Sequence, residues 1–198
     1  MRPDHDMDMP GARPDHSALL IVDMISDFGF PEGDQLAAEA GKVVGNMVAV
    51  RRMFREQRRP VIYVNDNFNR WTAGFGDLVE WAGRLGSRGS AMVDLLRPAR
   101  DDFYILKPKH SAFFETALPS LLDHLQVRAV TLVGVAGDSC VLSSALDAHI
   151  RELKVWVPSD ATASLTRERN ARAMQFLDES LGCDVRPSSC VDQSARSA

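Results

Sequence analysis

Short apolar runs alternate with longer amphipathic segments along most of the chain. The short runs are rich in β-branched residues and carry almost no charge, which is typical of strands buried on both faces of a sheet. They predict strands over residues 17–23, 60–64, 102–106, 129–133 and 153–157, with a short sixth strand around 183–185.

Helical periodicity separates most of these runs. Apolar side chains recur every three or four positions over residues 34–59, 118–125, 141–150 and 166–180. Residues 72–100 instead contain five glycines and predict an irregular segment with short helical pieces. A segment of this length usually covers a site or meets a partner chain. Strands that alternate with helices favour a doubly wound, mostly parallel α/β sheet.

The composition is that of an ordinary globular protein. With 198 residues, 45% hydrophobic and 25% charged, the chain suits one domain, assigned to residues 17–187 between polar tails at 1–16 and 188–198. A net charge of −4 with scattered signs favours neither a nucleic-acid nor a membrane partner. No apolar run approaches about 18 residues and the first residues lack a signal-peptide pattern, so we expect a cytoplasmic location.

The three cysteines show neither disulfide-framework nor metal-ligand spacing. Cys183 and Cys190 suggest no role. Cys140 differs because it follows a buried strand and lies within the first turn of a predicted helix. A helix start lowers a thiol pKa, so a reactive thiolate is expected at this position.

The turn that carries Cys140 has a defined pattern. Gly134 and Gly137 supply the backbone freedom that a tight turn needs. Asp138 or Ser139 is the expected N-cap of the helix that follows. The carboxyl end of a parallel strand is where open α/β folds place their sites.

Two other predicted strands end in chemically informative residues. Asp23 closes the first strand and Lys107 follows the third. If the strands are parallel neighbours, these side chains and Cys140 meet at one edge of the sheet. A carboxylate can take the proton of a thiol, and a nearby ammonium favours the charged forms of both groups. Salt-bridged strand ends around a structural thiol are the alternative interpretation.

Three motifs carry a resemblance to a known family. They are Leu19-Leu20-Ile21-Val22-Asp23-Met24-Ile25-Ser26-Asp27-Phe28, Leu106-Lys107-Pro108-Lys109-His110-Ser111-Ala112-Phe113 and Gly134-Val135-Ala136-Gly137-Asp138-Ser139-Cys140-Val141. In this order and at these separations, the chain resembles the isochorismatase-like cysteine hydrolase superfamily. That superfamily includes nicotinamidases, N-carbamoylsarcosine amidase and ureidoacrylate hydrolases. The resemblance implies a six-stranded, mostly parallel sheet in a three-layer αβα sandwich.

The resemblance also implies an Asp–Lys–Cys triad. Asp23 would be the general base and later acid, Lys107 the electrostatic partner, and Cys140 the nucleophile of a thioester acyl-enzyme. Of the two lysines in the motif, the family pattern selects Lys107 over Lys109. The family further implies a cis peptide between Val135 and Ala136, an oxyanion hole built from the N–H groups of Ala136 and Cys140, and a homo-oligomer, dimeric or tetrameric. Residues 72–100 would then cover the site or form the subunit interface.

The chain departs from nicotinamidases after its second strand. Those relatives carry a histidine-containing metal site there, whereas this chain has Asn65-Asp66-Asn67-Phe68-Asn69-Arg70-Trp71 with no histidine. We therefore expect no metal and no other cofactor. Asn65 and Asn67 would offer amide hydrogen bonds to a polar small-molecule substrate, or serve as turn residues. The pocket walls expected from aromatic side chains are Phe28, Trp71 and Phe114. His110 is interpreted as a structural neighbour of Lys107 and not as a base.

Three hypotheses follow for function. The presence of Cys140 favours a metal-independent cysteine hydrolase that cleaves a C–N bond of a small amide, carbamoyl or ureido substrate. An isochorismatase-type hydrolase of a vinyl ether, which needs no covalent thiol, is the second. A non-catalytic binding protein with the same fold is the third.

Overall fold

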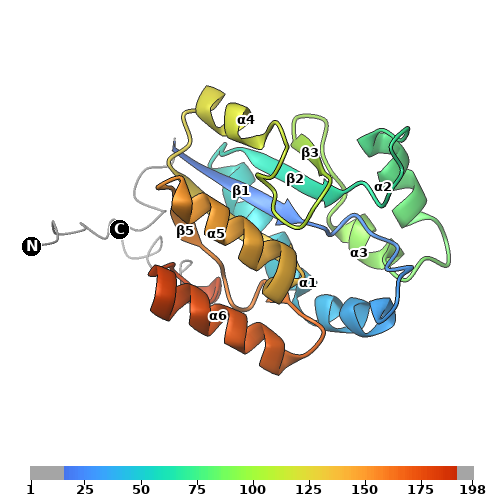
Figure 1. Ribbon diagram of the computed structural model, residues 1–198. Coiled ribbons are helices and arrows are strands. Elements are labelled where there is room, and N and C mark those ends of the chain that lie inside the picture. The colour runs from blue at the N-terminus through green and yellow to red at the C-terminus, as the bar shows by residue number, and fades with distance from the viewer. Residues whose placement is uncertain (1–15, 191–198) are drawn as a thin grey trace, which may run out of the picture.

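A single parallel sheet forms the centre of the computed structural model, which describes residues 16–190 (Figure 1). Its order is β3-β2-β1-β4-β5, and β6 pairs with the end of β4. The strands are β1 Ser17–Val22, β2 Val61–Asp66, β3 Phe103–Lys107, β4 Ala129–Val135, β5 Lys154–Trp156 and β6 Thr162–Ala163. Every residue of β1 and β4 is buried, as the uninterrupted apolar runs predict.

Helices cover both faces of the sheet, so the fold is a three-layer αβα sandwich (Figure 1). The helices are α1 Gly33–Glu56, α2 Phe75–Gly83, α3 Ser90–Leu95, α4 Leu118–His124, α5 Leu142–Ile150 and α6 Arg167–Leu181. Apolar side chains of α1, α2 and α3 pack on one face, where Leu19 and Ile21 point. Those of α4, α5 and α6 pack on the other face with Leu20 and Val22. The alternation along β1 follows from the two-residue repeat of a strand.

Strand register brings the carboxyl ends of four strands to one edge. Val22 pairs with Val64 of β2 and Gly134 of β4, and Asp66 pairs with Lys107 of β3. Gly134 has a φ of 122°, and a Cβ at this position would lie 2.1 Å from the carbonyl oxygen of Val22. Glycine is therefore required where β4 passes closest to β1.

The predicted sixth strand is wrong in its position. Residues 183–185 contribute only one bridge, between Asp184 and Trp156, whereas the sixth strand is Thr162–Ala163. The N–H of Gly134 donates to the carbonyl of Ala161, which aligns this short segment with the end of β4. A two-residue strand has no alternation for a sequence pattern to detect.

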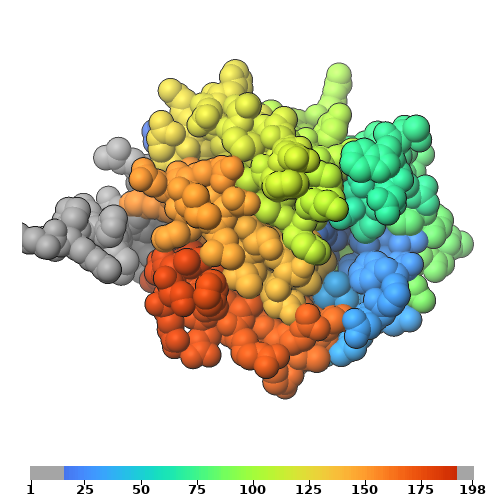
Figure 2. All heavy atoms as spheres, viewed as in Figure 1, coloured from blue at the N-terminus to red at the C-terminus, as the bar shows by residue number. Residues whose placement is uncertain are grey.

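The segment over residues 72–100 forms two short helices, α2 and α3, as its pattern indicates. Its connecting loop is fastened to the loop after β1, because Arg84 pairs with Asp27 at 2.9 Å. Arg88 donates to the carbonyl of Phe28 at 3.1 Å. In the space-filling view, α2 borders the segment that follows β3, and both lie above the loop after β1 (Figure 2).

None of the helices within residues 16–190 is long and apolar enough to cross a membrane. The predicted tails at 1–16 and 188–198 lie largely outside the described residues. Ser188 is described, and its backbone N–H and hydroxyl both bond to the carboxylate of Asp160.

Candidate active site

Asp23, Lys107 and Cys140 come together at the carboxyl edge of the sheet. The Nζ of Lys107 lies 2.9 Å from Oδ2 of Asp23 and 3.5 Å from Sγ of Cys140. Lys107 is fully buried, and its Nζ also donates to the carbonyl oxygen of Lys109 at 3.1 Å. Of the two lysines in the motif, Lys107 therefore places its ammonium group in the site, while the exposed Lys109 contributes a backbone acceptor.

Asp66 is a further carboxylate of the site, and the sequence interpretation did not assign it a role. Its backbone N–H donates to Oδ1 of Asp23 at 2.7 Å, which holds that carboxylate against Lys107. Its own Oδ2 lies 3.9 Å from Nζ of Lys107. The sequence carries no direct signal for it, because the predicted second strand ends at residue 64, whereas β2 extends to Asp66.

Cys140 lies in a π-helical turn, η2, which spans Gly137–Val141 and leads into α5. The N–H groups of Ser139 and Val141 both donate to the carbonyl oxygen of Ala136, which closes the turn. The peptide bond between Val135 and Ala136 is cis. The predicted N-cap is wrong, because no side chain caps the turn and the carboxylate of Asp138 instead accepts from Arg169.

The electrostatic setting of the thiol also differs from the expectation. Burial, reinforced by the neighbouring charge of Asp23, raises the pKa of Cys140 to about 12, although Lys107 acts in the opposite direction. The predicted lowering of this pKa by the helix start is therefore wrong. Burial disfavours the ammonium form of Lys107, but the nearby carboxylates, Asp23 above all, outweigh burial and raise the Lys107 pKa. The resting site thus holds a protonated thiol beside a lysine cation, and the thiol needs a base before it can attack.

His110 approaches the thiol more closely than the sequence suggested. Its Nδ1 lies 3.7 Å from Sγ of Cys140 and 3.4 Å from Oγ of Ser139. The side chain is exposed. His110 therefore borders the solvent side of the thiol, whereas Lys107 approaches from the interior.

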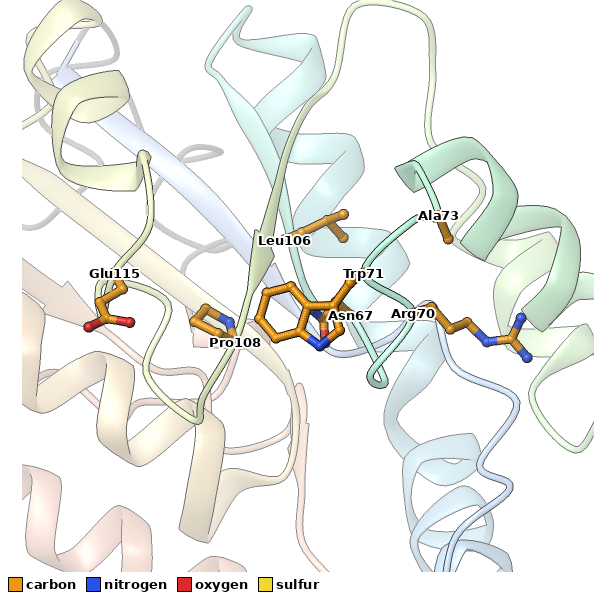
Figure 3. A pocket seen from close by; sticks show the side chains of 7 residues that line it. All are labelled: Asn67, Arg70, Trp71, Ala73, Leu106, Pro108 and Glu115. Carbon is orange, nitrogen blue, oxygen red and sulfur yellow. The ribbon is translucent and has the colours of Figure 1, made fainter.

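The predicted pocket residues divide into two groups. Asn67 and Trp71 line a cavity of about 190 Å³, together with Arg70, Ala73, Leu106, Pro108 and Glu115 (Figure 3). Leu106 and Pro108 are the chain neighbours of Lys107, but none of Asp23, Lys107 and Cys140 is among the residues that line this cavity. The indole of Trp71 lies in front of Asn67 and beside Pro108, while the guanidinium of Arg70 points away toward α2 and stacks on Trp81 (Figure 3).

The other predicted pocket residues have different surroundings. The amide of Asn65 accepts from the N–H of Ile25 and donates to its carbonyl, so it fastens the loop after β1. Phe28 is fully buried in the core on the α1 face. Phe114 is 47% exposed and is not part of the cavity lining.

The donors after β2 do not fit a metal ion of the kind that nicotinamidases hold. Both oxygens of the Asp66 carboxylate face other groups, the N–H of Phe68 and the ammonium of Lys107. Within residues 16–190, no cluster of three or more His, Cys, Asp or Glu side chains has the geometry of a metal site.

Comparison with known proteins assigns this chain to a family. A family model described as the isochorismatase domain matches residues 17–186. An isochorismatase family protein of Bacillus subtilis is 37% identical over 85% of this chain and 92% of its own length. A probable inactive nicotinamidase of Arabidopsis thaliana is 32% identical over 77% of this chain and 83% of its own. The crystal structure of N-carbamoylsarcosine amidase from Thermoplasma acidophilum superposes with a TM-score of 0.64 and 28% identity, covering 87% of this chain and 96% of that one. The chain therefore belongs to the isochorismatase family of hydrolases.

Proposed function

We propose that this protein hydrolyses a C–N bond of a small amide, carbamoyl or ureido compound through a thioester on Cys140. The observation that carries the proposal is the position of the Lys107 ammonium, within 2.9 Å of Asp23 and 3.5 Å of the Cys140 sulfur. An isolated structural thiol would need neither a buried cation nor a carboxylate beside it. The name of the structural relative, N-carbamoylsarcosine amidase, supports the same class of bond.

In the first half of the reaction, Asp23 takes the thiol proton of Cys140 as Sγ attacks the substrate carbonyl carbon. The carbonyl oxygen gains the negative charge, and the N–H groups of Ala136 and Cys140 are proposed to donate to it. Asp23 then passes the proton to the leaving nitrogen, the C–N bond breaks, and an amine or ammonia departs. Lys107 keeps its proton throughout, since its raised pKa favours the ammonium form.

In the second half, water attacks the thioester carbonyl. Asp23 accepts a proton from this water and returns one proton to Sγ when the C–S bond breaks. The products are the acid, or a carbamic acid from a ureido substrate, and the free thiol. No step passes through a metal ion.

We propose the cavity lined by Asn67 and Trp71 as the substrate pocket, and its size indicates a small substrate. With a volume of about 190 Å³, it holds on the order of ten non-hydrogen atoms at the packing density of protein interiors. The exposed indole of Trp71 offers a flat apolar contact. Of the two asparagines expected to bind substrate, Asn67 lines this cavity and Asn65 does not. We propose these two residues as substrate contacts.

The test is hydrolysis of a panel of small primary amides, N-carbamoyl amino acids and ureido acids, followed by release of ammonia or amine. The expected result is turnover of at least one class by the wild type and its loss in Cys140→Ser and Cys140→Ala. Turnover of isochorismate that survives both substitutions would replace the proposal with vinyl-ether hydrolysis. Wild-type protein that hydrolyses neither the panel nor isochorismate would favour a binding protein.

A further inference from the structure

The turn that holds Cys140 is tied to the first turn of α6. The Oδ2 of Asp138, two residues before Cys140, lies 2.5 Å from Nε of Arg169. The Asp138 side chain is 15% exposed and that of Arg169 is 44% exposed. The hydroxyl of Thr166 caps the helix by accepting from the N–H of Arg169, which fixes the backbone from which the guanidinium extends.

A second set of contacts joins the same two elements. The N–H of Asp138 donates to Oγ of Ser164 at 3.0 Å, and that hydroxyl donates to Oδ1 of Asn170 at 3.2 Å. A Cβ on Gly137 would lie 2.1 Å from the same Asn170 oxygen. Gly137 is therefore the residue that lets α6 approach the turn so closely.

Arg169 is the cation that Asp138 depends on. Among the described residues, the other carboxylate oxygen of Asp138, Oδ1, is buried without a hydrogen-bond partner. A carboxylate that is mostly removed from water is costly unless a partner compensates its charge. Removing the guanidinium would take away the cation that compensates this carboxylate and one of the ties between the turn and α6.

We infer that Arg169 is a positioning residue, which acts through Asp138 to hold the π-helical turn so that the Cys140 sulfur stays beside Lys107. The expected effect of Arg169 on kcat rests on the proposed function, whereas its effect on the position of the Cys140 turn does not. Arg172 offers a matched control, because it extends from the same helix and lines the same shallow groove beside Asp138 and Leu142. Within residues 16–190, the carboxylate of Asp138 pairs with Arg169 and not with Arg172.

The first experiment measures alkylation of Cys140 by iodoacetamide as a function of pH, followed by mass spectrometry on the peptide that carries Cys140. Because burial raises the pKa of this thiol, the wild-type midpoint is expected to lie well above the ordinary range of cysteine. In Arg169→Ala, the freed turn exposes the thiol, so the midpoint should shift toward the ordinary range of cysteine. Arg172→Ala should retain the wild-type midpoint. Arg169→Lys keeps a cation at this position, so its midpoint should lie between those of the wild type and Arg169→Ala. An unchanged midpoint in Arg169→Ala would overturn the inference.

The second experiment measures kcat and KM on whichever panel substrate the wild type hydrolyses. A misplacement of about 1 Å at the reacting centre can cost about a hundredfold in rate, so kcat of Arg169→Ala should fall by up to about that factor with little change in KM. If Arg169→Ala does not fold, the alkylation midpoint and the kinetics are measured on Arg169→Lys and Asp138→Asn instead. Alkylation needs no substrate, so a shifted midpoint with no hydrolysis by the wild type would refute the proposed function and leave the positioning role intact. An equal loss of kcat in Arg172→Ala would refute the positioning role.

Discussion

Asp66 and Lys107 are register partners at the ends of β2 and β3, and this pairing places two carboxylates around one buried ammonium. The two carboxylates are not equivalent. Asp23 lies 2.9 Å from Nζ and is 12% exposed, whereas Asp66 lies 3.9 Å away and is 37% exposed. Asp66 reaches Asp23 through its backbone N–H, a contact that does not depend on its side chain.

This difference predicts unequal effects of neutralising the two carboxylates. Asp66→Asn keeps the backbone donor to Asp23 and removes only a distant, partly exposed charge, so kcat/KM should fall less than about tenfold. Asp23→Asn removes the proposed base, and we expect a loss of about 10³-fold or more. Steady-state kinetics on the same substrate compare them. Equal losses in the two variants would mean that Asp23 is not the base.

Because Asp23 and Lys107 compensate each other's charge in the buried site, substitutions at the two positions should affect stability and activity differently. Lys107→Met leaves the mostly buried carboxylate of Asp23 without its cation, which should cost about 3–5 kcal/mol in the free energy of unfolding. The double variant Asp23→Asn/Lys107→Met contains neither charge and should recover much of that loss while remaining inactive. Urea unfolding and the hydrolysis assay measure the two properties. A double variant no more stable than Lys107→Met would contradict the account.

The raised thiol pKa predicts a loss of stability at alkaline pH. Above the ordinary cysteine pKa, the unfolded chain releases the Cys140 proton, while the folded protein keeps it until about pH 12. The unfolded state then binds fewer protons, so stability falls as pH rises between about 9 and 12, by up to about 1.4 kcal/mol per pH unit. Cys140→Ser removes this dependence. Cys183, whose pKa burial raises to about 11, adds a similar slope that persists in the Cys140 variant.

The check is urea unfolding at pH 8 and pH 10 for the wild type, Cys140→Ser and Cys183→Ser. Each substitution should reduce the difference in stability between the two pH values. If Cys140→Ser keeps the full wild-type difference, the thiol is not held in its protonated form by the fold.

Substitutions of Asn65 and Trp71 should have opposite effects, although the sequence suggested a substrate contact for both. The buried amide of Asn65 satisfies the N–H and the carbonyl of Ile25, so Asn65→Ala should destabilise the protein by about 2 kcal/mol. Trp71 is 74% exposed, so Trp71→Ala should leave the unfolding free energy nearly unchanged and raise KM. Thermal unfolding and steady-state kinetics distinguish the two. A stable Asn65→Ala variant with a raised KM would make Asn65 a substrate contact after all.

The position of the sheet and of one helical layer can be predicted from hydrophobic patterns in the sequence. The apolar runs of β1 and β4 and the long stripe of α1 are uniform enough to locate the sheet and one of its layers. The carboxyl ends of β1, β3 and β4 then bring Asp23, Lys107 and Cys140 to one edge. The features that could not be predicted from the sequence are short ones. The two-residue strand at Thr162–Ala163 exists only because it lies beside β4.

The errors at the site share one physical cause, which is that tertiary contacts overrode local propensity. Asp138 has the chemistry of an N-cap, but Arg169, 31 residues further along the chain, takes its carboxylate. The start of a helix should favour a thiolate at Cys140, but burial and Asp23 act more strongly. Neither effect can be read from neighbours in the sequence, because burial and the approach of α6 are set by the packed fold.

The most direct test of the central claim is the mass of the intact protein during turnover. Acid quenching in the presence of a slowly hydrolysed amide or carbamoyl substrate should trap a species heavier by the acyl group. The added mass should map to Cys140, be released by hydroxylamine, and be absent from Cys140→Ser. Turnover by the wild type with no adduct, together with undiminished turnover by Cys140→Ala, would contradict a covalent thioester at this site.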